Sequence, residues 1–218
     1  MIDLHTHTLL SDGELLPSEM VRRAEVAGYE VIGLTDHVDA SNIGYVLPAL
    51  VRVCGKLNSY WDILALPGVE ITHAPLQEIA RLVRYARKNG ADIVIVHGET
   101  VSEPVIPGTN RAGIEACADI IAHPGLIKKE DAALAAKMGV LLELTTRKAH
   151  SSTNSHVAKM AMRTGCGLIV NTDAHSHEDF MDEAKRSKLL RSSGVRGVNI
   201  AGLNRATLKL EIKKSLSP

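Results

Sequence analysis

Two histidines close to the N-terminus, His5 and His7, lie at the end of a short apolar run that begins at Ile2. In an extended strand, residues two apart point to the same side of the backbone. Both imidazoles are therefore expected to aim at one point just beyond the strand. Because imidazole nitrogen is a preferred ligand of divalent transition metals, this pair is a first candidate for a metal site.

The same arrangement recurs along the chain, where histidines and carboxylates follow short apolar runs. These residues are Asp36-His37, Glu70, His97, His123, Glu143 and Asp173-Ala174-His175. A single histidine of this kind is more often a core or surface residue than a ligand. The recurrence at many strand ends, however, indicates a cluster of divalent metal ions held by nitrogen and oxygen donors.

The elements that position these residues are short β-branched runs that alternate with helical patterns. Strands are expected at residues 2–5, 31–35, 63–71, 93–96, 120–122, 140–144 and 168–171. Helices are expected at residues 17–27, 48–60, 75–88, 129–137, 154–164, 179–191 and 205–214, with a long turn-rich loop at residues 103–113. Single helices between short strands imply right-handed βαβ crossovers and a parallel sheet.

Seven such units favour a closed barrel over an open sheet, and no linker rich in Pro, Gly or Ser interrupts the series. The sequence therefore predicts one domain over residues 1–218. In barrels of this kind the active site lies at the carboxyl ends of the strands. Every candidate ligand falls at such an end, so segments far apart in the sequence are expected to converge at one mouth.

The composition limits which partners and compartments fit the chain. Its 25 Lys and Arg residues balance 25 Asp and Glu residues, so a surface for long nucleic acid is not expected. The 3 cysteines are scattered and have no CxxC spacing, which predicts reduced, buried thiols. No apolar stretch approaches the roughly 20 residues that span a bilayer, and a cleaved signal would remove His5 and His7. We expect a cytoplasmic protein without membrane attachment, and the oligomeric state stays open.

Seven segments of the chain together resemble the PHP family, named for polymerase and histidinol phosphatase domains. In order they are Asp3-Leu4-His5-Thr6-His7-Thr8, Ser11-Asp12-Gly13, Thr35-Asp36-His37, Gly68-Val69-Glu70, Val96-His97-Gly98, Ala122-His123-Pro124-Gly125 and Asn171-Thr172-Asp173-Ala174-His175. The resemblance spans about residues 2–177. It implies an α/β fold, a distorted (β/α)7 TIM-like barrel of the PHP type, with a trinuclear metal centre.

Carried over position by position, the resemblance implies a complete set of metal ligands for three divalent ions. One ion would be held by His5, His7, Glu70 and Asp173. A second would share Glu70 as a bridge and add His97 and His123. The third would take Asp12, His37 and His175. Nitrogen and oxygen donors suit Zn²⁺, Mn²⁺ and Fe²⁺ about equally, so the sequence does not select the metal.

The charge balance of such a centre favours phosphate chemistry. Three divalent ions carry six positive charges, and the carboxylates of Asp12, Glu70 and Asp173 cancel half of them. The hypothesis is that two ions roughly 3.5–4 Å apart lower the pKa of a bridging water toward ~7 and place the hydroxide for in-line attack on phosphorus. The third ion would bind the non-bridging oxygens. In this hypothesis catalysis depends on Asp12, His37, Glu70 and His175.

Further polar residues near the predicted mouth each have two open interpretations. Glu143, Asp3 and Asp36 either orient a ligand histidine or are ordinary polar residues of the core and loops. His150 follows the sixth strand and is a candidate acid for the leaving group by its position alone. The family pattern gives it no ligand position.

Substrate contacts are predicted from residues that follow strand ends. Arg147 directly follows the sixth strand and precedes a Ser-Ser-Thr-Asn helix start whose amides can bind an anion. Arg111, in the long loop after the fourth strand, and His177 are further candidates for substrate or phosphate contacts. His73 and His156 are expected to be ordinary surface or helix residues.

The leading interpretation of function is a metal-dependent phosphomonoesterase for a small phosphorylated metabolite. Histidinol phosphate is the best-known substrate of stand-alone family members, but this chain is shorter than the well-characterised histidinol phosphatases, so that substrate stays open. One alternative is a nucleotide or oligonucleotide phosphodiesterase of PHP type, although the stretch between Glu70 and His97 holds one helix and no inserted domain. Another is a non-catalytic PHP module that keeps metals for stability or docking, against which the complete ligand set argues.

Overall fold

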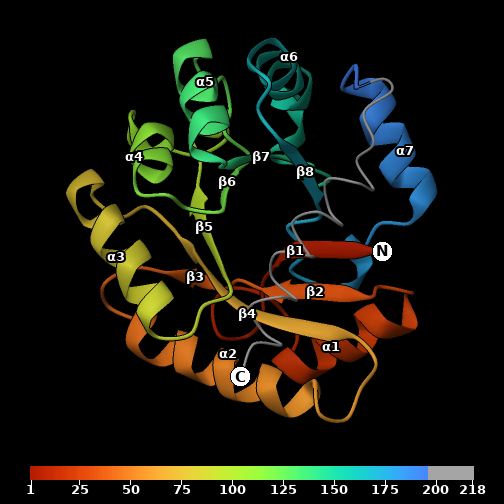
Figure 1. Ribbon diagram of the computed structural model, residues 1–218. Coiled ribbons are helices and arrows are strands. Elements are labelled where there is room, and N and C mark those ends of the chain that lie inside the picture. Colours follow the sequence, from red (N-terminus) through yellow and green to blue (C-terminus); the bar gives the residue numbers. More distant parts are fainter. Residues whose placement is uncertain (196–218) are drawn as a thin grey trace.

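Parallel strands form a nearly closed barrel in the computed structural model, which describes residues 1–195 (Figure 1). The strands are β1 (Ile2–Thr6), β2 (Val31–Leu34), β3 (His37–Val38), β4 (Leu64–Ile71), β5 (Ile93–His97), β6 (Ile120–Ala122), β7 (Leu141–Thr145) and β8 (Leu168–Asn171). Their order in the sheet is β1-β2-β4-β5-β6-β7-β8, and the short β3 pairs with β4. The predicted distorted (β/α)7 TIM-like barrel is therefore confirmed.

Helices surround the barrel on its outside (Figure 1). They are α1 (Pro17–Val26), α2 (Ile43–Leu57), α3 (Leu76–Lys88), α4 (Thr109–Glu115), α5 (Lys129–Met138), α6 (Asn154–Thr164) and α7 (Glu183–Ser192). Two 3-10 turns, η1 (Ser151–Thr153) and η2 (His177–Asp179), follow β7 and β8. The apolar faces of α1, α2 and α3 explain this arrangement, because their buried residues recur at helical spacing and pack against the strands.

Side chains rather than a continuous ladder join β1 to β8. An isolated parallel bridge pairs Thr6 of β1 with Ala174, three residues beyond the end of β8. Asn171 Oδ1 accepts a hydrogen bond from Leu4 N at 3.0 Å. The buried carboxylate of Asp3 accepts hydrogen bonds from the backbone and the hydroxyl of Thr172. Asp3 therefore helps to close the barrel, and it also accepts a hydrogen bond from the backbone N–H of the adjacent ligand candidate His5.

Two apolar clusters fill the molecule. The larger one lies between the strands and the helices, with Ile32, Val94 and Leu142 among its fully buried members. The smaller one, here called the inner cluster, consists of strand residues that pack on one another inside the barrel: Leu4, Val31, Leu66, Ile93, Ile95, Ile120, Ala122 and Ile169. Alternation along each strand separates the two clusters.

A bulge in β1 interrupts that alternation next to the predicted site. From Asp3 to Thr6, β1 advances one residue more than its partner β2. As a result Leu4 packs in the inner cluster while its neighbour His5 also reaches an interior residue, Glu143. In a regular strand adjacent side chains point to opposite faces, so the bulge re-aims this histidine.

Two predicted elements differ from the structure. The second helix starts at Ile43 rather than at Pro48, because buried residues upstream of the proline extend its apolar face. Helix α4 replaces part of the loop expected at residues 103–113. The carboxylate of Glu99 accepts hydrogen bonds from Gly108 N and Asn110 N at the start of α4, a long-range cap that local sequence does not reveal.

The helix predicted at residues 205–214 lies outside the described residues, so the prediction of one domain over the whole chain is not tested. Cys54 and Cys166 are buried thiols as expected, whereas Cys117 is exposed. Within residues 1–195, none of the helices combines the length and apolarity needed to cross a bilayer.

Candidate metal centre

The predicted metal ligands converge at the carboxyl end of the barrel. Potential ligand atoms lie within 4.8 Å of one another in four overlapping groups. These groups are His7, Asp12, His37 and His175; His5, His7 and Asp173; His5, Glu70 and His123; and His97, His123 and His150. All nine residues predicted from the sequence belong to a group, and His150 joins them.

Glu70 lies at the centre of the arrangement and is fully buried. Its Oε1 is 3.4 Å from His5 Nε2 and 3.7 Å from His123 Nε2. Its Oε2 is 2.7 Å from His37 Nδ1, but that nitrogen makes its hydrogen bond to Thr72 Oγ1 at 2.7 Å. Neither oxygen of Glu70 has a hydrogen-bond partner among the described residues. A buried carboxylate in this state needs a cation, so Glu70 is suited to bridge two ions.

Glu143 orients two of the ligand candidates. Its Oε1 is 2.8 Å from His5 Nδ1 and accepts a hydrogen bond from Asn171 Nδ2 at 2.8 Å. Its Oε2 accepts the backbone N–H of His123 at 3.0 Å. Because Nδ1 of His5 is engaged, Nε2 is left to face Glu70 and a metal. Of the two interpretations open for Glu143, the structure supports the orienting role.

Backbone strain marks two ligand candidates. His123 and Asp173 follow the ends of β6 and β8 and have positive φ values of 27° and 56°. Non-glycine residues rarely adopt this region, and such strain persists where the surrounding structure imposes it. The result is that Asp173 Oδ1 lies 3.1 Å from His7 Nε2 and Oδ2 lies 3.7 Å from His123 Nε2.

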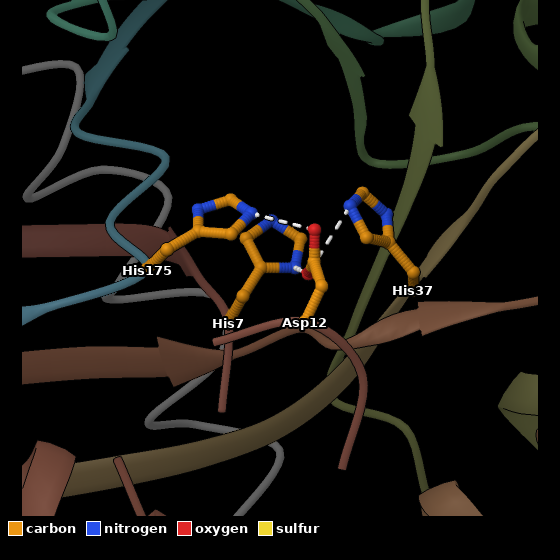
Figure 2. A group of neighbouring side chains, drawn as sticks. All are labelled: His7, Asp12, His37 and His175. Carbon is orange, nitrogen blue, oxygen red and sulfur yellow. Dashed lines mark ion pairs between the residues drawn. The ribbon is translucent and has the colours of Figure 1, made fainter. Parts of the chain in front are cut away.

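Asp12 joins three histidines in the third group (Figure 2). Its Oδ2 is 3.2 Å from His175 Nε2, and its Oδ1 is 3.6 Å from His37 Nε2 and 4.0 Å from His7 Nδ1. His175 directs Nδ1 to the carbonyl of Asp173 at 3.0 Å, which leaves its Nε2 free to face Asp12. His7 thus lies between this group and the one built around Asp173.

The turn that carries Asp12 is held by Asp36. This buried carboxylate accepts hydrogen bonds from the backbone and hydroxyl of Thr8 and from the hydroxyl of Ser11. Gly13 lets the turn close, because a Cβ there would lie 2.3 Å from the carbonyl oxygen of His7. Asp36 is therefore a positioning residue for the turn rather than a partner of His37.

His150 and Glu103 belong to the centre although the sequence patterns did not assign them as ligands. His150 is 5% exposed, and its ring stacks on that of His123 with centroids 4.1 Å apart. Glu103 Oε2 is 3.2 Å from Nε2 of both His97 and His73. The sequence patterns gave His150 no ligand position, and in the structure a ring nitrogen of His150 lies within 4.8 Å of those of His97 and His123.

Burial and the charges of neighbouring groups shift the pKa values of the cluster in different directions. Burial opposes the charged form of His5, but the carboxylates of Glu143 and Glu70 raise its pKa well above the usual value. Burial favours the neutral form of Glu70, yet His5 and the other histidines hold its pKa well below normal. Burial raises the pKa of Asp173 to about 7 and lowers that of His123. Bound cations would take the place of the shared protons.

The donor set fits divalent metal ions. Ligand atoms around one such ion lie about 3–4 Å apart when each bond is about 2.0–2.2 Å long. The contacts of Glu70 and Asp173 with His5, His7 and His123 fall in or close to this range. The buried Nδ1 atoms of His7 and His123 also lack hydrogen-bond partners among the described residues. Unpaired buried donors and unpaired carboxylate oxygens in one place are what ions would satisfy.

The predicted substrate contacts divide into one residue at the centre and two away from it. Arg147 Nε is 3.7 Å from Asp173 Oδ2, and its Nη1 donates to the Asp173 carbonyl at 3.2 Å. Arg111 lies in α4 and pairs with Glu115 and Asp131 on the outer surface. The structure does not bring Arg111 to the cluster, because the helix turns it outward.

The remaining histidines lie in three different parts of the molecule. His177 begins η2 and lines a shallow apolar pocket beside α1, so it is not brought to the cluster either. His156 contacts the carbonyl of Ile127 from α6, as expected of a helix residue. His73 is 44% exposed but reaches Glu103, and therefore borders the mouth.

Comparison with known proteins gives both sequence and structural relatives. A family model described as PHP domain matches residues 3–145. The uncharacterized protein MJ1295 of Methanocaldococcus jannaschii is 43% identical over 195 residues, which cover 88% of this chain and 89% of that protein. The DNA polymerase/3'-5' exonuclease PolX of Bacillus subtilis is 26% identical over 204 residues, covering 84% of this chain but 35% of PolX.

Solved structures share the fold at low sequence identity. A chain in the cryo-EM structure of archaeal ribonuclease P with mature tRNA has a TM-score of 0.70 at 16% identity, covering 97% of this chain and 91% of that one. The putative histidinol phosphatase hisK from Listeria monocytogenes has a TM-score of 0.60 at 13% identity, covering 85% and 99%. At these identities the likeness establishes the fold alone.

Proposed function

This chain belongs to the PHP domain family, and on that premise we propose that it is a metal-dependent phosphoesterase that hydrolyses a small phosphate monoester. The site residues proposed are the nine ligand candidates at the carboxyl end of the barrel, together with Arg147. The chemistry belongs to the hydrolases, and the substrate class is a phosphorylated metabolite rather than long nucleic acid.

The observation that carries this proposal is the state of Glu70. Both oxygens are buried without hydrogen bonds among the described residues, and imidazoles of His5, His37 and His123 lie within 3.7 Å of them. A carboxylate of this kind is costly unless a cation compensates it. A purely structural site would be expected to satisfy such a group with hydrogen-bond donors.

Divalent ions bound here would supply positive charge for the phosphate oxygens and a water of lowered pKa. The protein's own contribution is to fix the ligands. Glu143 holds His5, Asp36 holds the turn of Asp12, and the carbonyl of Asp173 holds His175. A site whose ligands are fixed beforehand loses little free energy to reorganisation during the reaction.

Arg147 supports phosphate as the group recognised. Its guanidinium lies beside Asp173 at the edge of the centre and is 31% exposed, so it can contact both the cluster and an incoming anion. It also lines a cavity of about 440 Å³ with Thr146, Lys148, Thr172, Glu178, Asp179 and Lys185. That volume suits a small metabolite, and both charge signs on its wall suit a zwitterionic leaving group.

The test compares a phosphate monoester with a diester. Metal-stripped protein is reloaded with Zn²⁺ or Mn²⁺ and assayed with p-nitrophenyl phosphate and bis(p-nitrophenyl) phosphate. We expect metal-dependent hydrolysis of the monoester, its loss in Glu70→Gln, and its retention in the matched surface variant His156→Gln. Equal activity in metal-free protein, or no hydrolysis of either ester with any metal, would contradict the proposal.

A nucleotide or oligonucleotide phosphodiesterase is the second candidate, and the similarity to PolX supports it. The balanced charge of the chain argues against a long polyanionic substrate. Preferential hydrolysis of the diester, followed by release of mononucleotides from a short single strand, would favour this candidate over the first.

A further inference from the structure

His150 is buried inside the candidate metal centre without a role in the nine-ligand pattern. It precedes η1 in the segment between β7 and α6, and its side chain is 5% exposed. Its ring stacks on His123 and meets the ring of His97 edge-on, with centroids 6.1 Å apart. A ring nitrogen of each of these three histidines lies within 4.8 Å of the others.

Two hydroxyl groups determine which nitrogen of His150 faces the centre. Its Nδ1 lies 2.9 Å from Thr100 Oγ1 and 2.8 Å from Ser102 Oγ, both on the segment that follows β5. When Nδ1–H donates to these hydroxyl oxygens, Nε2 is the unprotonated nitrogen. That atom lies 3.5 Å from Glu103 Oε1 and 3.9 Å from Asp173 Oδ2. An imidazole whose outer N–H is held in this way is typical of metal-ligating histidines.

We propose that His150, oriented by Thr100 and Ser102, is a third imidazole ligand of the ion held by His97 and His123. This inference rests on the proposed metal centre and adds a ligand beyond the family set. The hydroxyls satisfy Nδ1, as burial of any imidazole requires, and leave Nε2 directed at the carboxylates of Glu103 and Asp173.

The proposal assigns different chemistry to different positions of the centre. The group around Asp12 would hold an ion with an exposed carboxylate, whereas the position at His97, His123 and His150 is rich in nitrogen. Three imidazoles suit Zn²⁺ or Fe²⁺ better than Mn²⁺ or Mg²⁺, which prefer oxygen. Together with the bridging carboxylate of Glu70, the three histidines would give this ion four protein ligands, the number that Zn²⁺ usually takes. The nitrogen-rich position is therefore expected to be the most selective one.

The test measures metal binding rather than turnover. The full-length chain is stripped of metal and titrated with Zn²⁺ and Co²⁺ against a competing chelator, and the metal content is measured by mass spectrometry. We expect His150→Gln to weaken one ion by at least about tenfold and to change the visible absorption of the cobalt protein, while the other ions bind as before. His156→Gln, a histidine on α6 outside the centre, is the matched control and should behave as wild type.

A second variant tests the proposal without removing His150 itself. Thr100→Val combined with Ser102→Ala keeps His150 but removes its hydroxyl partners, and should weaken the same ion by about 10–100-fold. His150→Asp should shift the preference of that position from Zn²⁺ toward Mn²⁺ in a competition experiment. Thermal unfolding of the metal-free variants shows whether each is folded. If His150→Gln does not fold, the metal affinity of the Thr100→Val, Ser102→Ala double variant tests the proposal.

The outcomes separate this inference from the function on which it rests. If wild-type protein binds its ions and hydrolyses a phosphate ester, but His150→Gln binds them with the same number, affinity and cobalt spectrum, the inference alone is overturned. If wild-type protein binds no ions, both the proposed function and the inference fail. If ions bind with the expected response to His150→Gln but no ester is hydrolysed, only the proposed function fails.

Discussion

The inner cluster and the metal centre are built from the same strands but differ in chemistry. Strand β4 contributes Leu66 to the inner cluster and then Glu70 to the centre. Strand β5 contributes Ile95 and then His97 on the same face. Both strands thus change from apolar to ionisable side chains on one face toward their carboxyl ends.

This difference shows how the barrel separates stability from chemistry. Burying an aliphatic side chain in the inner cluster stabilises the fold by about 1.5–3 kcal/mol. Burying carboxylates and imidazoles together is unfavourable unless charges are paired, and Glu70 lacks hydrogen bonds among the described residues. The apolar end of each strand therefore offsets the cost of the polar end. Substitutions at the polar end should therefore lower activity more than stability, and substitutions at the apolar end should lower stability more than activity.

The largest effect is expected at the centre. Glu70→Gln keeps the side-chain shape but removes the charge between His5 and His123, and should lower kcat by about 10³-fold or more, since metal-assisted charge stabilisation is worth several kcal/mol. Steady-state kinetics with a phosphate monoester measures this. Added Zn²⁺ should raise the Tm of wild type more than that of the variant. If Glu70→Gln kept the activity of wild type, the division between a catalytic centre and a stabilising inner cluster would be contradicted.

At the apolar end the effect should be on stability. Leu66→Ala is expected to cost about 2–5 kcal/mol in the free energy of unfolding, because Leu66 is 2% exposed and leaves a cavity. Urea denaturation measures the loss, and kcat per folded molecule should stay unchanged. The control is Val26→Ala at a residue 74% exposed, where a change within about 0.5 kcal/mol is expected. A large loss of kcat in Leu66→Ala would show that the two ends are not independent.

Asp3 lies between the two regions and makes stability depend on pH. Burial raises the pKa of Asp3 from 3.8 to about 6, so the folded protein holds this proton to a higher pH than the unfolded chain. This stabilising contribution of Asp3 is fully present below pH 3.8 and decreases as the pH rises through about 6. Above that pH the free energy of unfolding is lower by about 3 kcal/mol. Asp3→Asn should lack this dependence.

The measurement for Asp3 uses metal-free protein. The difference in unfolding free energy between Asp3→Asn and wild type is followed from pH 4 to pH 7 by urea denaturation, and should change in favour of the variant as pH rises. Lost hydrogen bonds to Thr172 would add an offset that does not depend on pH. A difference that stays constant across this range would exclude the buried titration.

The smallest effect is expected at the edge of the centre. Arg147→Ala should lower kcat/KM by about 10–150-fold, since a charge-assisted hydrogen bond to substrate is worth about 1.5–3 kcal/mol. Bound metal should be unchanged, as measured by mass spectrometry. Arg111→Ala is the matched control, because its guanidinium pairs with Glu115 and Asp131 on the outer surface. An equal loss in both variants would contradict a substrate contact by Arg147.

The sequence alone determined the order of the elements and the residue types at the strand ends. Apolar runs ending in His5, Glu70 and His97 predicted both the barrel and the convergence, because a parallel barrel places every carboxyl end at one mouth. The family resemblance then supplied the set of ligand candidates. The barrel is confirmed and the side chains do lie together, because both depend on local periodicity and on chain order.

Tertiary structure decided what local patterns do not encode. The bulge that re-aims His5 depends on pairing with β2, and the positive φ of His123 and Asp173 is imposed by surrounding contacts. Helix α4 starts where Glu99 caps it from a distance. His150 reaches the centre because Thr100 and Ser102, about fifty residues earlier in the chain, hold its ring. Each of these depends on contacts between distant segments, which exist only after the chain has folded.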